Sequence, residues 1–285
     1  MAGRKGNMAG FTPRGNMMGM NEVLVRIEPL RISTSGGPPV RDQCDVVVEE
    51  LLTIMVEGVG SFAVMCTPSD VEALALGFVF SEGLIDSAGD VVGVTRRPDQ
   101  HAVAMRIEEP GRVASERNLI VTSSCGLCGS RNIDRLLTGQ VRCGDSLRIP
   151  AAHLRTVAEK MASGQQLFAR TGGTHAAGIF NAAGNMIAFG EDLGRHNALD
   201  KAVGKCLMEE VSPVGLATFL SGRVSLELVA KAARAGLEIV AAVSAPSSLA
   251  IQAAEKCNIT LCGFVRADRA TVYTHPHRVV VGGAV

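Results

Sequence analysis

Aromatic side chains are scarce in this sequence of 285 residues, which has no tryptophan and a single tyrosine. Proteins that bind single-stranded nucleic acid commonly stack the bases on aromatic side chains, so the composition argues against such a surface. An excess of one charge is also missing, because 28 basic side chains balance 28 acidic ones. This balance gives no support for broad electrostatic binding to nucleic acid or to a membrane. We therefore expect no nucleic acid and no membrane among the partners.

Long apolar segments are absent as well, since no stretch approaches the roughly 20 consecutive apolar residues that span a bilayer. Residues 1–20 are rich in Gly, Met and Asn and lack the apolar core of a secretory signal, so we expect a disordered arm there. The eight cysteines are irregularly spaced, which is typical of reduced thiols and not of a disulfide framework. Together these features predict a cytoplasmic protein.

Residues 21–122 predict an N-terminal α+β domain. Alternating and β-branched apolar residues favour strands at 22–27, 45–56, 62–66, 91–95, 102–107 and 118–122. A helix is expected to begin after Ser69, as its N-cap, and to end near Gly83. Its apolar residues occur nearly all round, which predicts that this helix is buried.

Residues 131–285 predict a C-terminal α/β domain. Strands are expected at 216–220, 237–243 and 259–265, with helices at 225–235 and 248–256 between them. Such a β-α-β-α-β unit has parallel strands joined by right-handed crossovers. Before it we expect a helix at 150–161, a hairpin through 179–189 and a helix beginning near residue 194. The fold class is therefore α/β, with an α+β N-terminal part.

Each of the three predicted parallel strands ends in a polar loop. Arg223 follows the first strand, Ser244 and Ser247 follow the second, and Arg266 and Arg269 follow the third. Ligands of open α/β sheets bind at the carboxyl ends of the strands, where helix N-termini offer N–H groups to anions. The pattern favours a site for a phosphorylated or nucleotide-bearing ligand over solvated loop tips.

A histidine also stands at a predicted helix start, in the sequence Gly194-Arg195-His196-Asn197. His196 is a candidate acid, base or anion ligand, and a structural hydrogen bond is the alternative. The glycine turn that ends in His175 is interpreted as a structural turn that precedes a strand.

Two glycine-flanked thiols form the most distinctive motif, a predicted reactive loop at residues 123–130 that contains Cys125 and Cys128. It lies between a predicted strand and a predicted short helix at 131–137. Glycines lower the cost of moving the backbone, and a helix start beside Arg131 favours thiolate at Cys128.

Four functions of this loop can be compared. A structural zinc site needs a second ligand pair, and the other cysteines form no second C-x-x-C; His275 and His277 are at most a half-site, so no metal is expected. A thioredoxin-like dithiol usually has an aromatic neighbour, which is missing. Inert thiols on a flexible loop and a sulfur carrier that forms a persulfide are the remaining interpretations.

Four segments together resemble the FdhD family of formate dehydrogenase accessory sulfurtransferases, over residues 22–277. The segments are Cys125–Gly129, Thr171–Gly178, Gly194–Lys201, and Phe264–Arg269 leading into Tyr273–Pro276. The resemblance implies a homodimer with a cytidine-deaminase-like fold. The zinc signature of the deaminases, with H-x-E and P-C-x-x-C, is missing, so deaminase chemistry is not implied.

The resemblance also implies a function. Such a protein accepts sulfur from a cysteine desulfurase and transfers it to molybdenum (or tungsten) bis(molybdopterin guanine dinucleotide), the cofactor of formate dehydrogenase. Cys125 would carry the persulfide with Cys128 as its partner, and GDP would mimic part of the cofactor. The implied cofactor-binding residues are Phe264, Val265, Arg266, Ala267, Asp268 and Arg269, to which we add Arg223 and His196. Ala267 stands where the resemblance leads us to expect a glycine in many relatives. A non-catalytic cofactor chaperone and a dithiol redox protein are the alternatives.

Overall fold

The computed structural model describes residues 23–108, 119–121 and 141–282, with the side chains of 119–121 left out. The predicted N-terminal arm and the thiol loop with Cys125 and Cys128 lie outside these residues. So do the helix expected at 131–137 and the junction at residues 122–131 between the two predicted domains, whose division stays a prediction.

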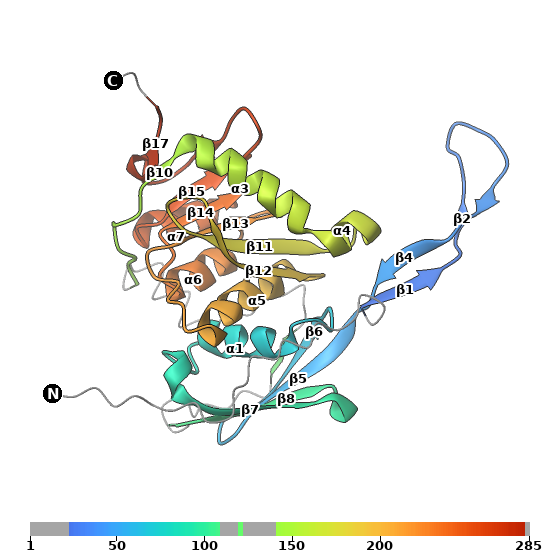
Figure 1. Cartoon of the computed structure of the whole chain (residues 1–285), viewed down its shortest axis with the longest axis horizontal. Helices are drawn as coiled ribbons and strands as arrows, with labels where there is room; N and C mark the ends of the chain where they lie inside the picture. Colours follow the sequence, from blue (N-terminus) through green and yellow to red (C-terminus); the bar gives the residue numbers. More distant parts are fainter. Residues whose placement is uncertain (1–22, 109–118, 122–140, 283–285) are drawn as a thin grey trace.

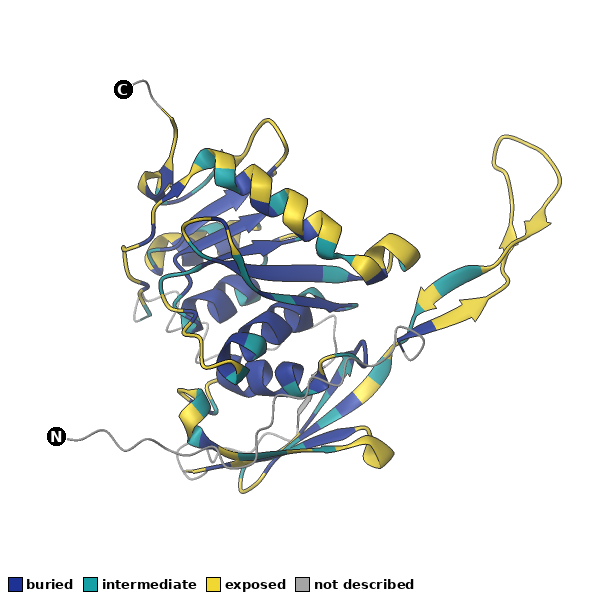
Figure 2. Cartoon of the chain, viewed as in Figure 1, coloured by how far each residue is buried: buried dark blue, intermediate teal, exposed yellow. Residues whose placement is uncertain are grey.

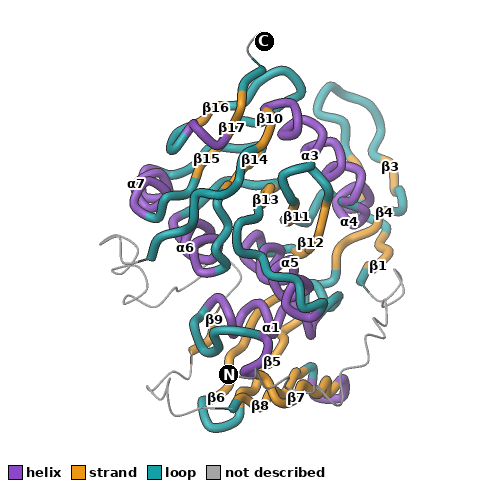
Figure 3. The backbone as a smooth tube through the Cα atoms, turned by 60° about the vertical axis from the view of Figure 1, so that its left-hand side comes forward, coloured by secondary structure: helices purple, strands orange, loops and turns teal. Residues whose placement is uncertain are grey.

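The described residues form alternating layers of sheet and helix (Figure 1). A five-stranded sheet from the first half of the chain is covered by α1, and a six-stranded sheet from the second half lies between α3 on one face and α5, α6 and α7 on the other. Figure 3 shows α7, α6 and α5 following one another along the sheet. The α-helices of the described residues are α1 (Val71–Ser81), α3 (Ala151–Gly164), α4 (Gln166–Thr171), α5 (Arg195–Met208), α6 (Leu226–Arg234) and α7 (Ser248–Lys256).

The five-stranded sheet has the order β7-β8-β5-β6-β9. Its strands are β7 (Val91–Arg97), β8 (Ala102–Ile107), β5 (Glu50–Val56), β6 (Gly60–Cys66) and β9 (Leu119–Val121). In β5, Leu52, Ile54 and Val56 alternate with more exposed residues, because successive side chains of a strand point to opposite faces. The predicted strands are thus confirmed, including the hairpin of β7 and β8.

Helix α1 is buried almost all round, as its sequence predicts (Figure 2). It packs between the five-stranded sheet and α5. Two glycines allow α1 and α5 to approach closely, since a Cβ on Gly77 would lie 1.9 Å from the Asp200 carbonyl oxygen, and one on Gly204 as close to that of Ala73. The predicted cap is wrong: Asp70 is the N-cap residue, at φ 51°, and no side chain caps the helix.

The six-stranded sheet has the order β12-β11-β13-β14-β15-β16. Its strands are β12 (Met186–Asp192), β11 (His175–Phe180), β13 (Ala217–Leu220), β14 (Ile239–Ala242), β15 (Thr260–Gly263) and β16 (Thr271–Val272). Strands β13, β14 and β15 are parallel, which confirms the β-α-β-α-β unit. Strand β11 is antiparallel to both of its neighbours.

Alternate residues of this sheet face two different cores. Phe219 and Ala241 pack with Val157 of α3, whereas Leu220 and Val240 pack in the core shared by α1, α5, α6 and α7. That second core also contains Ile54 and other residues of the first sheet, so one continuous apolar cluster joins the two halves of the described chain.

A two-stranded ribbon extends away from these layers (Figures 1 and 2). It consists of β1 (Leu24–Ile27) with β4 (Cys44–Val47) and, further out, β2 (Leu30–Arg31) with β3 (Val40–Arg41). Asp45 and Arg170 of α4 join at its base, with N···O 2.6 Å. The remaining short elements are β10 (Ile149–Pro150), β17 (Val279–Val280) and the 3-10 turns Ala88–Asp90, Pro98–Gln100 and Pro276–Arg278. None of the described helices is long and apolar enough to cross a membrane.

Candidate functional site

The carboxyl edge of the six-stranded sheet collects helix starts and polar loops. Parallel strands β13, β14 and β15 end there, and α6 and α7 begin there with Ser225 and Ser247 as N-caps. Strand β12 runs in the same direction as β13, because both are antiparallel to β11. Therefore Asp192 at the end of β12, Gly194 at the start of α5 and His175 at the start of β11 lie at this edge too.

Four side chains that can carry positive charge share one corner of this edge, and we call His175, Arg195, His196 and Arg223 the cationic corner. His175 begins β11, Arg195 and His196 open α5, and Arg223 follows β13. Burial, and after it the charges of Arg195, His196 and Arg223, hold the pKa of His175 below its ordinary value, while Asp192 opposes the effect. The predicted residues His196 and Arg223 therefore share this corner with His175 and Arg195, since β11 pairs with β13 and α5 begins at the same edge.

Backbone contacts hold this corner in place. The Ala176 amide donates to Ser221 Oγ at 2.8 Å, and the Ser221 amide donates to the Ala176 carbonyl at 2.9 Å. Gly222 leaves room for the imidazole, because a Cβ on it would lie 3.2 Å from His175 Nδ1. The loop that contains Arg223 is tied to the next one by a bridge between Val224 and Pro246. The corner is thus supported on two sides by rigid backbone.

His196 is buried between the starts of α5 and α6, with 4% of its surface exposed. Its Nε2 lies 3.2 Å from Ser225 Oγ and 3.0 Å from Glu227 Oε2. Its Nδ1 is buried and has no partner among the described residues. The structural hydrogen bond considered for His196 therefore exists, yet it occupies only one of the two ring nitrogens.

The predicted segment Phe264–Arg269 lies at the same edge, two strands away from β13. Phe264 is exposed and left-handed, at φ 51°, a conformation that costs a non-glycine residue about 1–3 kcal/mol. Arg266 Nη1 donates to the carbonyls of Val243, at 2.5 Å, and Val265, at 2.8 Å. The turn is closed by the Arg266 amide, which donates to the Arg269 carbonyl at 2.7 Å.

The other members of this segment differ in exposure. Val265 is buried, whereas Asp268 and Arg269 form an exposed ion pair with N···O 3.5 Å. Ala267, where the resemblance led us to expect glycine, does not adopt a positive φ. The segment therefore combines a fixed backbone with exposed Phe264, Asp268 and Arg269 side chains.

Much of the motif Gly194–Lys201 is structural, which sequence reasoning missed. Lys201 Nζ and Asp192 Oδ2 are 2.7 Å apart and fully buried. Asp192 also accepts from the side chain of Asn197 and from the Thr67 amide, at 2.9 and 3.1 Å. A second buried pair joins Asp200 to Lys231, with N···O 2.8 Å. Buried charges are tolerated when they are paired and hydrogen-bonded, so these pairs join α5 to β12 and to α6. The hydrogen bonds of Asp192 and Asp200 with Thr67 and Ser81 link the same pairs to the first half of the chain.

Comparison with known proteins gives the family. The profile of the FdhD/NarQ family matches residues 47–280. This chain belongs to the FdhD/NarQ family. A relative named sulfur carrier protein FdhD from Picrophilus torridus is 40% identical over 245 residues, which cover 83% of this chain and 92% of the relative. Another of the same name, from Anaeromyxobacter dehalogenans, is 40% identical over 267 residues, covering 87% and 92%.

A solved structure supports the fold of this FdhD/NarQ member. The crystal structure of a candidate formate dehydrogenase accessory protein from Desulfotalea psychrophila superposes with a TM-score of 0.75 over 90% of this chain and 100% of that chain. At 23% identity the likeness concerns the fold alone. The resemblance found in the sequence motifs is confirmed, as is the mixed α/β architecture.

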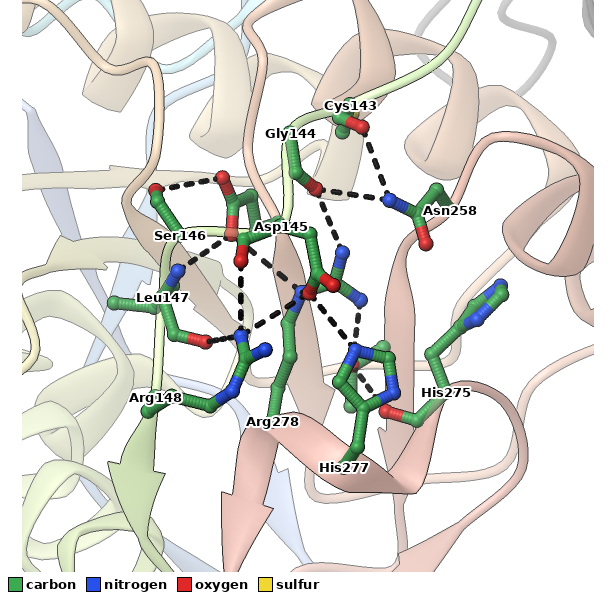
Figure 4. Close-up of polar contacts among 12 residues, drawn as sticks. Cys143, Gly144, Asp145, Ser146, Leu147, Arg148, Asn258, His275, His277 and Arg278 are labelled. Carbon is green, nitrogen blue, oxygen red and sulfur yellow. Dashed lines mark hydrogen bonds and ion pairs between the residues drawn. The ribbon is translucent and has the colours of Figure 1, made fainter.

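The amino edge of the same sheet contains the histidines considered for a metal half-site (Figure 4). His275 Nε2 lies 2.9 Å from the Glu255 carbonyl, and His277 Nε2 lies 2.8 Å from Asp145 Oδ1. No group of three or more potential metal ligands occurs in the part of the chain that the structure describes. In this FdhD/NarQ member the two histidines therefore belong to a hydrogen-bonded cluster.

The six described cysteines lie outside the family's C-x-x-C motif, and five of them are buried. Burial raises the pKa of Cys66, Cys143, Cys206 and Cys262 to about 12, and that of Cys257 to about 11. Cys44, on the ribbon, is half-buried. Because the thiolate is the nucleophilic form, the five buried thiols are unreactive near neutral pH.

Proposed function

We propose that this chain is a sulfur carrier that takes up sulfur as a persulfide on Cys125 and delivers it to a molybdenum bis(molybdopterin guanine dinucleotide) cofactor for formate dehydrogenase. The observation that carries the proposal is the family match over residues 47–280, which includes Cys125 and Cys128. Relatives that are 35–40% identical over most of this chain are named sulfur carrier proteins. The proposed activity is that of a sulfurtransferase.

Uptake needs no change of oxidation state. A cysteine desulfurase would present its sulfur as a persulfide, and the Cys125 thiolate would attack the terminal sulfur while the desulfurase cysteine leaves as a thiolate. The inactivity of the five buried thiols supports Cys125 and Cys128 as the reactive pair. A thiolate at the C-x-x-C motif is therefore the expected acceptor.

Delivery as a sulfide ligand needs two electrons, and the second thiol can supply them. The Cys128 thiolate would attack Sγ of Cys125, expel hydrosulfide toward the metal and leave a Cys125–Cys128 disulfide. A cellular dithiol would then reduce this disulfide before the next cycle. This assigns Cys128 the role of resolving thiol.

The carboxyl edge of the six-stranded sheet supports the cofactor part of the proposal. Its candidates are the predicted residues Arg223, His196 and the segment Phe264–Arg269, which lie at one edge beside helix starts. Guanine nucleotides bound there would hold the large cofactor while its metal meets the persulfide, and such positioning contributes much of the rate of a transfer. GDP is the proposed mimic of the bound dinucleotide.

Finer features belong to the same proposal. We infer a cytidine-deaminase-like fold, a cytoplasmic location and a homodimer, with a cysteine desulfurase and formate dehydrogenase as partners. The division into residues 21–122, a thiol loop at 123–130 and residues 131–285 also belongs here.

The mass of the intact protein tests the proposal. After incubation of the reduced chain with a cysteine desulfurase and cysteine, we expect a gain of one sulfur that is absent in Cys125→Ala. Cys44→Ala is the matched control, because Cys44 is the one described thiol that is not buried. In cells that lack their own FdhD protein, Cys125→Ala should leave formate dehydrogenase inactive, whereas Cys44→Ala should restore it.

The outcomes separate the alternatives. A chain that binds GDP but never gains sulfur would be a cofactor chaperone. A Cys125–Cys128 disulfide without any persulfide would indicate a dithiol redox protein. Full formate dehydrogenase activity with Cys125→Ala would remove Cys125 as the carrier.

A further inference from the structure

We propose that the cationic corner is a diphosphate subsite, in which Arg195 and His175 join Arg223 and His196, and that the turn Phe264–Arg269 holds the guanine base. This inference rests on the proposed function, because it divides one guanine nucleotide between two ends of the same sheet edge. It adds Arg195 and His175 as binding residues.

The corner has an excess of positive charge. Among the described residues, Arg195 and Arg223 form no hydrogen bond or ion pair, and the buried Nε of Arg195 has no partner. Of the carboxylates beside this corner, Asp192 is paired with Lys201, and Glu227 lies 3.0 Å from His196 Nε2. Neither forms an ion pair with Arg195 or Arg223.

The starts of α5 and α6 also lie at this corner. Helix α5 has 14 residues and α6 has 9, and neither is capped by a side chain of its N-cap residue, whereas Ser247 Oγ accepts the Ala250 amide at the start of α7. The first N–H groups of a helix and its dipole favour an anion. The dipoles of α5 and α6 therefore favour an anion beside the cationic corner, where Asp192 Oδ1 already accepts the Gly194 amide at 2.8 Å.

Buried His196 provides an independent observation. Its Nε2 faces Ser225 and Glu227 on α6, and these groups leave Nδ1 without a hydrogen bond. A buried nitrogen without a partner is rare in folded proteins and calls for an explanation. A phosphate oxygen at the start of α5 would provide the missing partner.

The turn Phe264–Arg269 is less suited to phosphate. The guanidinium of Arg266 is already engaged by two carbonyls. A base fits this turn better, because Phe264 offers an exposed ring and a carboxylate such as Asp268 can accept both N–H donors on the Watson–Crick edge of guanine. Strands β13 and β15 are separated by β14, so the carboxyl ends of these two strands are about 10 Å apart.

Three probes separate base from phosphate: guanosine, GDP and inorganic pyrophosphate, each titrated by calorimetry into the full chain. Arg195→Gln should weaken GDP binding between roughly tenfold and one-hundredfold, as expected for the loss of a charge-assisted bond, and should abolish pyrophosphate binding while guanosine binding is retained. Asp268→Asn should weaken GDP and guanosine by the same factor and leave pyrophosphate unaffected.

Arg155→Gln is the matched control, because it removes the same charge from an exposed position on α3, on the opposite face of the sheet. It should bind all three probes like the wild type. Thermal melts of each variant establish that it is folded. The inference is overturned if Arg195→Gln binds GDP normally, if it loses guanosine and GDP equally, or if the wild type binds no pyrophosphate.

Failure of this inference is distinguishable from failure of the proposed function. The persulfide assay measures the gain of sulfur on Cys125 in the absence of nucleotide. A wild type that acquires sulfur but fails the three-probe test refutes the diphosphate subsite alone. A wild type that passes the three-probe test but acquires no sulfur refutes the sulfur carrier and retains the subsite.

Discussion

The two edges of the six-stranded sheet differ in what surrounds their arginines. At the amino edge, Arg278 is fully buried, donates to the Gly144 carbonyl at 2.6 Å and lies 3.5 Å from Glu238 Oε2 (Figure 4). At the carboxyl edge, Arg195 and Arg223 have no such partners in the part of the chain that the structure describes. A buried arginine that is paired holds segments together, whereas a cation left unpaired beside helix starts is available to a ligand.

The amino edge also shows how pairing affects titration. Burial alone would raise the pKa of Glu238, but hydrogen bonds from the Leu147 and Ser146 amides and the Ser146 hydroxyl, with the charge of Arg278, leave it below its ordinary value. Arg278 and Glu238 thereby fasten residues 143–149 to the starts of β14 and β15. The two edges should therefore respond differently to the same kind of mutation.

The largest effect is expected from Arg278→Met. It leaves Glu238 buried without its cation, and breaking a buried pair in this way costs about 3–5 kcal/mol. We expect the free energy of unfolding, measured by urea denaturation, to fall by that amount, with GDP affinity unchanged in the folded protein. Loss of GDP affinity without loss of stability would remove the distinction between the edges.

Arg148→Met is the control for that experiment. Arg148 belongs to the same cluster and pairs with Asp145 at 3.1 Å, but both side chains are about half exposed. Exposed pairs contribute roughly 0–1 kcal/mol, so this variant should remain close to the wild type in stability.

The carboxyl edge could be predicted in outline from sequence. The β-α-β-α-β pattern implies parallel strands, and parallel strands bring Arg223 and Arg266 to one edge. The pattern could not predict which strand pairs with β13 on the side away from β14. Strand β11 pairs with it across a long sequence separation, and only this pairing brings His175 and the start of α5 to Arg223.

The hydrogen-bond partners of individual side chains also could not be predicted from the sequence. Sequence places Arg266 in a strand-end loop but does not reveal that its guanidinium binds two carbonyls. Ser69 matched the pattern of a helix cap, yet its hydroxyl accepts from Lys201 at 3.3 Å while Asp70 begins the helix. Both residues are engaged by groups that are distant in sequence, and local patterns contain no information on such contacts.

A smaller effect is expected from Arg223→Gln. Arg223 is exposed, unlike the partly buried Arg195, so its attraction to phosphate is weakened by solvent and salt. Affinity for GDP should fall about two- to fivefold at low ionic strength, and the difference should vanish in about 1 M salt, where charges are screened within a few ångströms. Calorimetry at both salt concentrations measures this, and an effect that is equally large at high salt would mean a desolvated contact.

The smallest effect concerns pH and His175. Burial, Arg195, His196 and Arg223 hold its pKa below the ordinary 6.5 despite Asp192, so the unfolded chain binds the proton more readily. The contribution of His175 to the free energy of unfolding is therefore fully present above pH 6.5 and is lost as the pH falls through the lowered pKa of His175. Glu238 has an ordinary value of 4.5 and a lowered pKa, so its contribution persists at pH 5.5.

Thermal melts at about pH 7.5 and pH 5.5 therefore measure the effect of His175 at the carboxyl edge, because the contribution of Glu238 at the amino edge is retained at both pH values. The wild type should lose more stability than His175→Gln between the two pH values, because glutamine takes up no proton. Saturating GDP should reduce this loss, since a bound diphosphate stabilises protonated His175 and raises its pKa. An equal loss in both proteins, or a loss that GDP does not change, would mean that His175 does not face the phosphates.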